Sequence, residues 1–249
     1  MNLQLLLLPA LFASVSLDNS SDAAFHRGVR ERANAAEARP AFAEAAKGYR
    51  EYWHHKHQRG IALAWGRASY LAGDLPSAIA AFRSGLHYYP ADAELLAGLR
   101  FCRAEATSLG VASVPPEGLR QRFTPGQRLA FAVLAMTFFA FGLLCQFTVR
   151  WRSSVAWMFI GILGLVTTAV LEWQCQREIA VDLAQPPCVV RFDTPLRTGN
   201  GESYAPLLPA LLPRGTEARE LARRGGWVQV QLESGEIGWL PEEMLVMQI

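Results

Sequence analysis

LAFAVLAMTFFAFGLLCQFTV occupies residues 129–149 and VAWMFIGILGLVTTAVL occupies residues 155–171, and neither run contains a charged side chain. As a helix that rises about 1.5 Å per residue, the first run would be about 31 Å long, which matches the hydrocarbon core of a bilayer. The second run has 17 residues, and Trp173 can extend it to the level of the headgroups. The alternative is a pair of core helices in a soluble domain, which rarely carry two such runs in succession. We therefore expect a two-helix transmembrane hairpin over residues 129–173.

The short connection between the two runs decides where the rest of the chain lies. Two crossings return the chain to its starting side, and residues 150–154 are too few to fold, so both flanking parts share one compartment. The spans contain no Asp, Glu, Lys or His, which argues against an ion path or a proton relay and favours an anchor. Gly161, Gly164 and Thr168 lie on one helical face and would allow the two helices to pack closely.

Two features of the sequence indicate opposite orientations for this hairpin. Residues 1–17 include the apolar run LLLLPALFASVS, which resembles the core of a signal peptide although no Lys or Arg precedes it. This signal-like segment favours export, with an uncleaved anchor or the start of the first helix as alternatives. Four arginines flank the spans on the side of the domains and two lie in the loop, which by the positive-inside rule favours the cytoplasm.

Residues 62–90 read ALAWGRASYLAGDLPSAIAAFRSGLHYYP, with small and large residues at helical spacing. The pattern closely resembles a tetratricopeptide repeat, a helix-turn-helix unit of about 34 residues. Three small residues stand where helices of such a unit approach one another: Gly66, Ala78 and Gly85. Gly73 permits the tight turn, and Pro90 ends the second helix.

Neighbouring helices are expected because such repeats do not bury their faces alone. Residues 42–52 resemble the second helix of an earlier repeat, and residues 92–106 fit a closing helix. We therefore expect an all-α domain of tetratricopeptide helical repeats over residues 18–107, followed by a linker at 108–128. Its concave face would bind a protein segment and, by repeat register, is lined by Leu63, Arg67, Tyr70, Ala97 and Phe101. The alternative for Tyr70 and Phe101 is packing between repeats.

The spacing of the histidines and cysteines does not indicate a metal site or a disulfide. His54, His55 and His57 form the run HHKH, but no cysteine or carboxylate stands at ligand spacing. A solvated helix end explains the cluster, so we expect no metal and no cofactor. Of the four cysteines, only Cys175 and Cys188 could close a loop beside the hairpin. We expect both to be free, as an interfacial thiol and a buried strand residue.

After a second linker at residues 174–185, short alternating runs separated by Gly turns extend over residues 186–249. In WVQVQL, at residues 227–232, apolar and polar side chains alternate as in a half-buried strand. Together with GGWVQV at 225–230 and GEIGWL at 235–240, these runs resemble a bacterial SH3-type domain, which implies a small all-β SH3-like barrel. The resemblance implies binding of peptides or cell-wall components, although the fold does not determine the ligand.

Three aromatic side chains of this domain are candidates for its binding surface: Tyr204, Trp227 and Trp239. Their rings could stack on a ligand. The alternative is that both tryptophans belong to the core of the barrel.

The sequence offers little support for an enzyme or a nucleic-acid-binding protein. The formal net charge is +2, so no strong electrostatic attraction to nucleic acid is expected. The chain contains no Walker-type loop, no G-x-S-x-G elbow and no H-E-x-x-H motif. We therefore expect a multidomain, non-enzymatic, membrane-embedded protein that binds partners.

The order of segments resembles the BatE-type proteins of bacterial aerotolerance operons: a signal-like segment, tetratricopeptide repeats, two transmembrane helices and an SH3-type domain. The resemblance implies a scaffold in a Bat-type membrane complex for stress or oxygen tolerance, with von Willebrand-type membrane proteins of the same operon as partners. It also implies a bacterial inner-membrane location with periplasmic domains, which favours export over the arginine count. The alternative function is a cell-wall anchor or sensor whose SH3-type domain contacts peptidoglycan.

Overall fold

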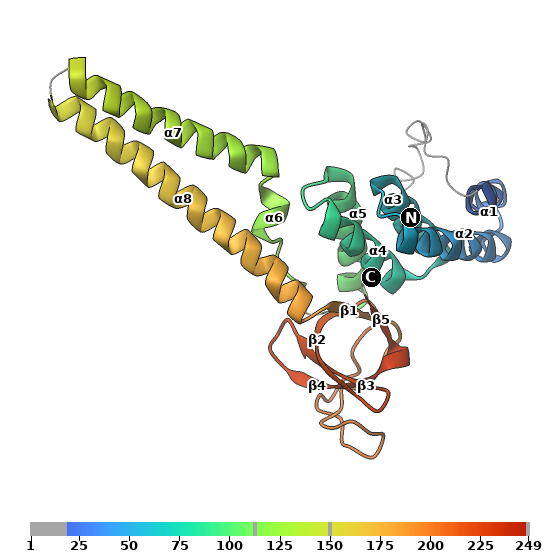
Figure 1. The fold of residues 1–249 in the computed structure, drawn as a ribbon. Helices are drawn as coiled ribbons and strands as arrows, with labels where there is room; N and C mark the ends of the chain where they lie inside the picture. The colour runs from blue at the N-terminus through green and yellow to red at the C-terminus, as the bar shows by residue number, and fades with distance from the viewer. Residues whose placement is uncertain (1–18, 112–113, 149–150, 248–249) are drawn as a thin grey trace.

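The computed structural model describes residues 19–111, 114–148 and 151–247 of the chain. The signal-like segment that we expected at residues 1–17 lies outside these residues. The described part contains eight helices and one antiparallel sheet of five strands, arranged as a helical layer, a long helical hairpin and a β-domain (Figure 1). The helical character, the two apolar helices and the C-terminal β character expected from the sequence are confirmed at this level.

Five consecutive helices form the helical layer: α1 (Asn19–Arg30), α2 (Ala35–His55), α3 (Arg59–Ala72), α4 (Leu75–Tyr88) and α5 (Ala93–Ser108). Side-chain caps begin three of them. The carboxylate of Asp74 accepts a hydrogen bond from the Ser77 N–H at 3.1 Å, and Asp92 accepts from two N–H groups of α5, which satisfies donors that the helix itself leaves free. Asn34 does the same for α2. Gly73 ends α3 with a φ of +86°, where other residues would be strained.

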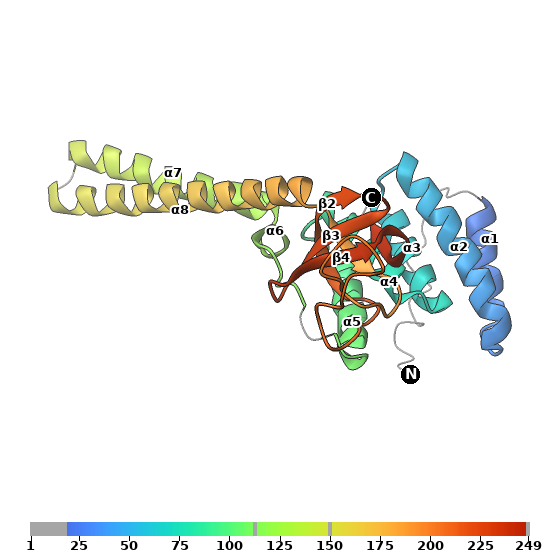
Figure 2. The same cartoon turned by 90° about the horizontal axis from the view of Figure 1, so that it is seen from below.

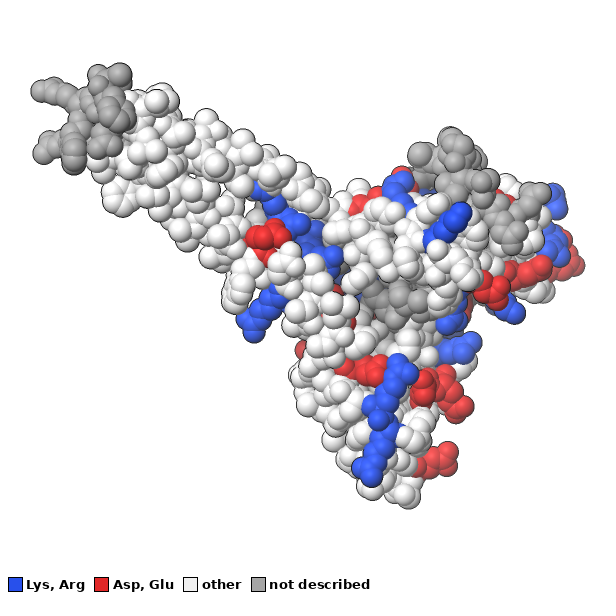
Figure 3. All heavy atoms as spheres, viewed as in Figure 1, with Lys and Arg blue, Asp and Glu red and all other residues white. Residues whose placement is uncertain are grey.

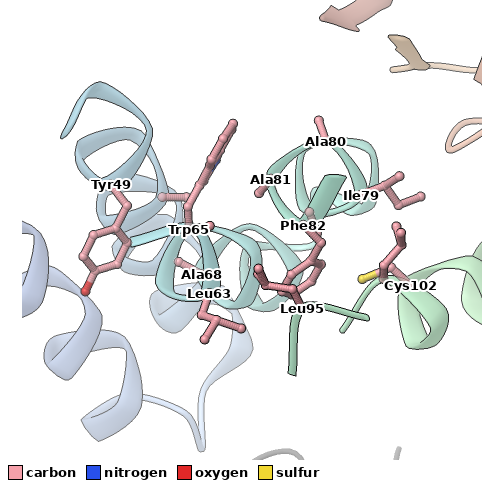
Figure 4. Packing of buried hydrophobic residues seen from close by; sticks show 14 of the residues in the cluster. Tyr49, Leu63, Trp65, Ala68, Ile79, Ala80, Ala81, Phe82, Leu95 and Cys102 are labelled. Carbon is pink, nitrogen blue, oxygen red and sulfur yellow. The ribbon is translucent and has the colours of Figure 1, made fainter. Parts of the chain in front are cut away.

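Small residues let these helices approach one another. A Cβ atom on Gly66 would lie 2.6 Å from the ring of Phe82, and one on Gly85 would lie 2.7 Å from the Cβ of Ala62. Ala78 is fully buried. Phe82 points toward Leu95 of the next helix (Figure 4). Each small residue therefore stands at a contact that a larger side chain would disturb, as the repeat pattern predicts.

The hairpin consists of α7 (Pro125–Thr148) and α8 (Trp151–Ala184), which run antiparallel, lie close together at the end away from the globular part and diverge toward it (Figure 1), where α8 extends past α7. Figure 2 shows the same two helices from below. Both are long and apolar enough to cross a membrane. Only 11% of the most apolar stretch of α7 and 6% of that of α8 are buried. The two helices therefore do not form a soluble core. At Gly161 a Cβ atom would lie 2.5 Å from the backbone nitrogen of Phe139, and at Gly164 it would lie 2.8 Å from Ala135. Glycines thus bring the backbones together.

Helix α8 continues past the apolar span into the segment that we expected to be a linker. Residues 174–184 contain neither Gly nor Pro, and Pro186 is the first residue that stops the helix. The single helix of 34 residues is about 51 Å long and leads directly to the β-domain. The other expected linker, residues 108–128, includes the short helix α6 (Leu119–Arg122) and the first turn of α7.

The β-domain has the strand order β4-β3-β2-β1-β5, and all its neighbours are antiparallel. Its elements are β1 (Pro187–Val190), β2 (Glu217–Arg224), β3 (Trp227–Leu232), β4 (Ile237–Pro241), a 3₁₀ turn (Glu242–Met244) and β5 (Leu245–Met247). The sheet is strongly curved (Figure 1) around a core that includes Cys188, Val190, Val228, Val230 and Leu240. Gly225 and Gly226, both at positive φ, make the turn between β2 and β3.

Candidate binding surfaces

Two helices of the layer bring together most of the residues that we expected to line a groove. Tyr70 of α3 and Phe101 of α5 meet edge to face with their ring centroids 5.1 Å apart, and both are half-buried. Burial, followed by the charges of Glu105 and Cys102, raises the pKa of the Tyr70 hydroxyl, so this group stays protonated. The pair is therefore both a contact between helices and a partly accessible aromatic surface.

The remaining three expected groove residues differ in accessibility. Leu63 is only 6% exposed and belongs to the core of the layer, so it offers almost no surface to a ligand. Arg67 is half-buried and lies 3.7 Å from the carboxylate of Glu94. Ala97 is exposed on α5. The accessible members of this set thus lie on α5 and on the polar edge of α3.

An ion-pair cluster borders this groove. Arg59 of α3 forms ion pairs with Asp92 and with Glu94, the latter at 3.3 Å, and Glu94 also lies near Arg67. Burial alone would raise the pKa of Asp92, but the hydrogen bonds from Arg59 and from N–H groups of α5 hold that pKa below its ordinary value. Asp92 therefore stays ionised, and it both caps α5 and fixes α5 to α3.

The helical layer and the β-domain meet at a buried cluster of one carboxylate and two arginines. Glu217, at the start of β2, is 3% exposed. Its Oε2 atom accepts from Arg83 of α4 at 2.6 Å, and its two oxygens accept from Arg103 of α5 at 2.6 and 3.0 Å. Burial opposes ionisation of Glu217, yet the two arginines lower the pKa of its carboxyl group overall. Both contacts of Arg103 are of the bidentate kind that fixes orientation as well as distance.

Apolar contacts extend this junction. Val189 of β1 and Val246 of β5 belong to the same buried cluster as the helices. Gly215, at a φ of +89°, lies so close to α5 that a Cβ atom would be 3.2 Å from Ala106. The layer and the β-domain therefore share one core. Sequence reasoning missed this junction because Glu217 is 134 and 114 residues from its two partners, and no local pattern connects them.

The two tryptophans of the β-domain lie on the outer face of the sheet. In β3, Val228, Val230 and Leu232 are buried while Trp227 and the two glutamines are half-buried, and Trp239 is half-buried in β4. Trp227 is opposite Pro241, and Gln229 is opposite Trp239, so the two indole side chains are diagonal neighbours on one face. They do not fill the core of the domain.

Tyr204 lies in the long loop between β1 and β2 and is 49% exposed. Its ring covers Gly199, where a Cβ atom would be 2.5 Å from the ring. The guanidinium of Arg197 donates to the carbonyl oxygens of Glu202 and Tyr204 at 2.7 and 2.8 Å, and the backbone of Arg197 pairs with that of Trp239. The loop that carries Tyr204 is thus fixed to β4, the strand of Trp239.

The histidines of the run HHKH and the four cysteines do not form a metal site or a disulfide in the part of the chain that the structure describes. His54 and His55 are exposed at the end of α2, whereas His57 stacks on Tyr88 with centroids 4.2 Å apart. Within the described residues, no group of three His, Cys, Asp or Glu side chains could hold a metal ion. All four cysteines are free thiols, and burial raises the pKa of Cys102 and of Cys188 to about 12. At neutral pH these two are therefore unreactive thiols.

Comparison with protein-family models, with curated proteins and with solved structures found no match to this chain. The geometry itself offers two partly exposed aromatic surfaces, one between α3 and α5 and one on the sheet. Both are held on a single body that continues into the apolar hairpin.

Proposed function

We propose that the protein is a non-enzymatic, membrane-anchored scaffold that binds partner proteins through tetratricopeptide repeats and an SH3-type domain. The observation that carries the proposal is the shared core of the helical layer and the β-domain, joined by the buried contacts of Glu217. A rigid body with two recognition surfaces holds both partners at a defined spacing, and rigidity lowers the entropy that binding costs.

The hairpin supplies the anchor in this proposal. Its two apolar helices are mostly exposed, as expected for helices whose solvent is lipid. Because α8 has no break before the β-domain, the binding surfaces would stand at a fixed height above the bilayer. The resemblance to BatE-type proteins supports a place in a Bat-type complex at the periplasmic face of a bacterial inner membrane, with von Willebrand-type membrane proteins as partners.

The groove is tested by a charge placed on its exposed wall. Ala97→Arg adds a long cation at an exposed position of α5, where it should block a protein segment without disturbing the core. Crosslinking in native membranes should recover a von Willebrand-type membrane protein with the unaltered chain and at least tenfold less with Ala97→Arg. Ala43→Arg, at an exposed position of α2, is the matched control. Equal recovery with the two variants would refute a binding role of the groove.

A second candidate function rests on the outward-facing pair Trp227 and Trp239. The two indole side chains are half-buried diagonal neighbours on the outer face of the sheet, and an amphipathic tryptophan ring suits contact with a cell-wall peptide or sugar. If the β-domain contacts peptidoglycan, the purified full-length protein should sediment with sacculi, and Trp227→Ala with Trp239→Ala should abolish this. Phe192→Ala, at a side chain of the same domain that is 54% exposed, should leave sedimentation unchanged. Failure of the unaltered protein to sediment would exclude the cell-wall function and leave the scaffold.

A further inference from the structure

A hollow of about 520 Å³ lies between α6 and the two long helices, away from both binding surfaces. Its volume falls within the range of about 300–1,000 Å³ typical of small-molecule sites. Apart from two threonines and one glutamine, its lining is apolar and includes Leu119, Phe123, Leu134 and Ile160. The hydroxyls of Thr167 and Thr168 donate to carbonyls of their own helix, so these donors are satisfied without a polar ligand.

The hollow has a deep apolar end and an end next to the globular part. Along α8 its lining runs from Ile160 to Gln174, which is about 21 Å at 1.5 Å per residue. This length exceeds half of a hydrocarbon core of about 30 Å, so the hollow would extend through one leaflet. Leu119 and Phe123, from α6 and the residue after it, lie at the end nearest the globular part.

Two arginines stand beside that end in the sequence. Arg122 precedes the lining residue Phe123, and Arg177 follows Gln174 by three residues, on the same side of α8. Neither guanidinium forms an ion pair with any residue that the structure describes, although Arg177 lies over the ring of Trp173. Figure 3 shows both basic and acidic atoms where the hairpin meets the globular part, and none on the described outer hairpin in that view.

The carboxylates beside these arginines are already occupied. Glu172 accepts from Arg128, and Glu178 accepts from the N–H groups of Leu119 and Arg120 at 2.8 and 3.3 Å. A Cβ atom on Gly118 would lie 2.7 Å from the Glu178 carboxylate, so a larger residue there would have to displace the end of that side chain. Glu178 thus fixes α6 across the base of the hairpin, and Arg122 and Arg177 remain available to an anion from outside the chain.

We propose that this hollow binds one anionic phospholipid from the leaflet facing the globular part, with an acyl chain along Leu134 and Thr167 and the phosphate between Arg122 and Arg177. The apolar hollow suits the acyl chain of such a lipid, and the two arginines beside its end suit the phosphate. A transmembrane helix of a partner fits less well, because α6 closes the hollow at the level where that helix would have to continue. The inference rests on the membrane anchoring proposed above.

Native mass spectrometry of the full-length protein in detergent, titrated with phosphatidylglycerol or phosphatidylcholine, tests the site. One phosphatidylglycerol should be retained about thirtyfold more strongly than phosphatidylcholine, which is the gain expected from two nearby arginines. Arg122→Gln with Arg177→Gln should remove this preference. Thr167→Phe fills the hollow and should weaken retention of both lipids about tenfold, since the apolar area available to the acyl chain is lost. Val166→Phe is the control, since Val166 is 54% exposed and does not line the hollow.

The outcomes separate the lipid site from the anchor. Resistance of the protein to alkaline carbonate extraction reports membrane anchoring, so extraction of the unaltered protein would refute the proposed function itself. In a protein that resists extraction, equal retention of the two lipids, or equal retention by Thr167→Phe and Val166→Phe, would overturn the lipid site. A photocrosslinker at Thr167 that captures another polypeptide in place of lipid would also overturn it and assign the hollow to a partner helix.

Discussion

A buried ion-pair cluster joins the helical layer to the β-domain, whereas close backbone packing joins α7 and α8 along their uncharged runs, with their ion pair between Arg128 and Glu172 outside those runs. At the first junction, a carboxylate that is 3% exposed is enclosed by two arginines and apolar side chains. At the second, glycines bring backbones into contact, and the apolar runs at 129–149 and 155–171 contain no charge. In the water-exposed part, a buried ion-pair cluster fixes the orientation of the β-domain on the helices. Between helices surrounded by lipid there is no hydrophobic driving force, so close backbone contact and its dispersion attraction hold them together.

The largest effect concerns the side of the membrane on which the helical layer and the β-domain lie. These two parts can share a core only if both ends of the hairpin are in one compartment. We expect alkaline phosphatase fused after Ser108 and after Ile249 to be active in both cases, since that enzyme folds only outside the cytoplasm. Activity of a cytoplasm-only reporter at both sites would reverse the orientation and support the arginine count. Opposite results at the two sites would show that the hairpin does not cross twice, and the comparison would fail.

The second largest effect is expected from breaking the charged junction. Glu217→Ala leaves two buried guanidinium groups unpaired, which should lower the free energy of unfolding by about 3–5 kcal/mol. Denaturant unfolding of the full-length protein in detergent measures this. Glu233→Ala, at an exposed carboxylate of the same domain, should change it by no more than about 0.5 kcal/mol.

A triple variant sharpens that result. Replacing all three members, as Arg83→Met, Arg103→Met and Glu217→Leu, should restore most of the lost stability, because an apolar set leaves no charge unpaired. If the triple variant were as unstable as Glu217→Ala, packing rather than unpaired charge would explain the loss.

Local patterns in the sequence predicted much of this fold, and the unpredicted parts have common physical reasons. Uncharged runs, helical spacing and strand alternation depend on neighbours within one element, so the hairpin, the helices and the strand Trp227–Leu232 followed from them. The continuation of α8 to Ala184 was missed because absence of Gly and Pro is a weaker signal than their presence. The role of Glu217 depends on two residues more than a hundred positions away.

The candidate surfaces show the same limit. Register assigned Tyr70 and Phe101 to one groove, with packing between repeats as the alternative, and in the structure their rings meet edge to face. It also assigned Leu63 to the groove, yet that side chain is buried by its neighbours and belongs to the core. Whether a residue between two helices faces a ligand or a neighbour depends on the third helix, which the pattern of one repeat does not specify.

A smaller effect is expected at the glycine junction. Gly161→Leu places a side chain where even a Cβ atom would be 2.5 Å from the backbone of Phe139, so the helices must separate, at a cost of about 1–3 kcal/mol. Cysteine crosslinking between α7 and α8 in membranes should become slower. Leu163→Ala, at a residue that is 65% exposed, is the control. Unchanged crosslinking in Gly161→Leu would show that the two helices do not pack through this face.

The smallest effect is a dependence of stability on pH to which the charged junction contributes and the glycine junction does not. The pKa of Glu217 is lowered on folding because Arg83 and Arg103 favour the carboxylate more strongly than burial opposes it. A lowered folded pKa means that the stabilisation is complete above the unfolded value of about 4.3 and is lost as the pH falls through the folded value. Unfolding measured from pH 6 down to pH 3 should therefore show a steeper loss for the unaltered protein than for the triple variant without charges. Identical slopes would mean that Glu217 does not titrate with folding. The Gly161→Leu variant should follow the slope of the unaltered protein, since the contact that it disturbs involves no titratable group.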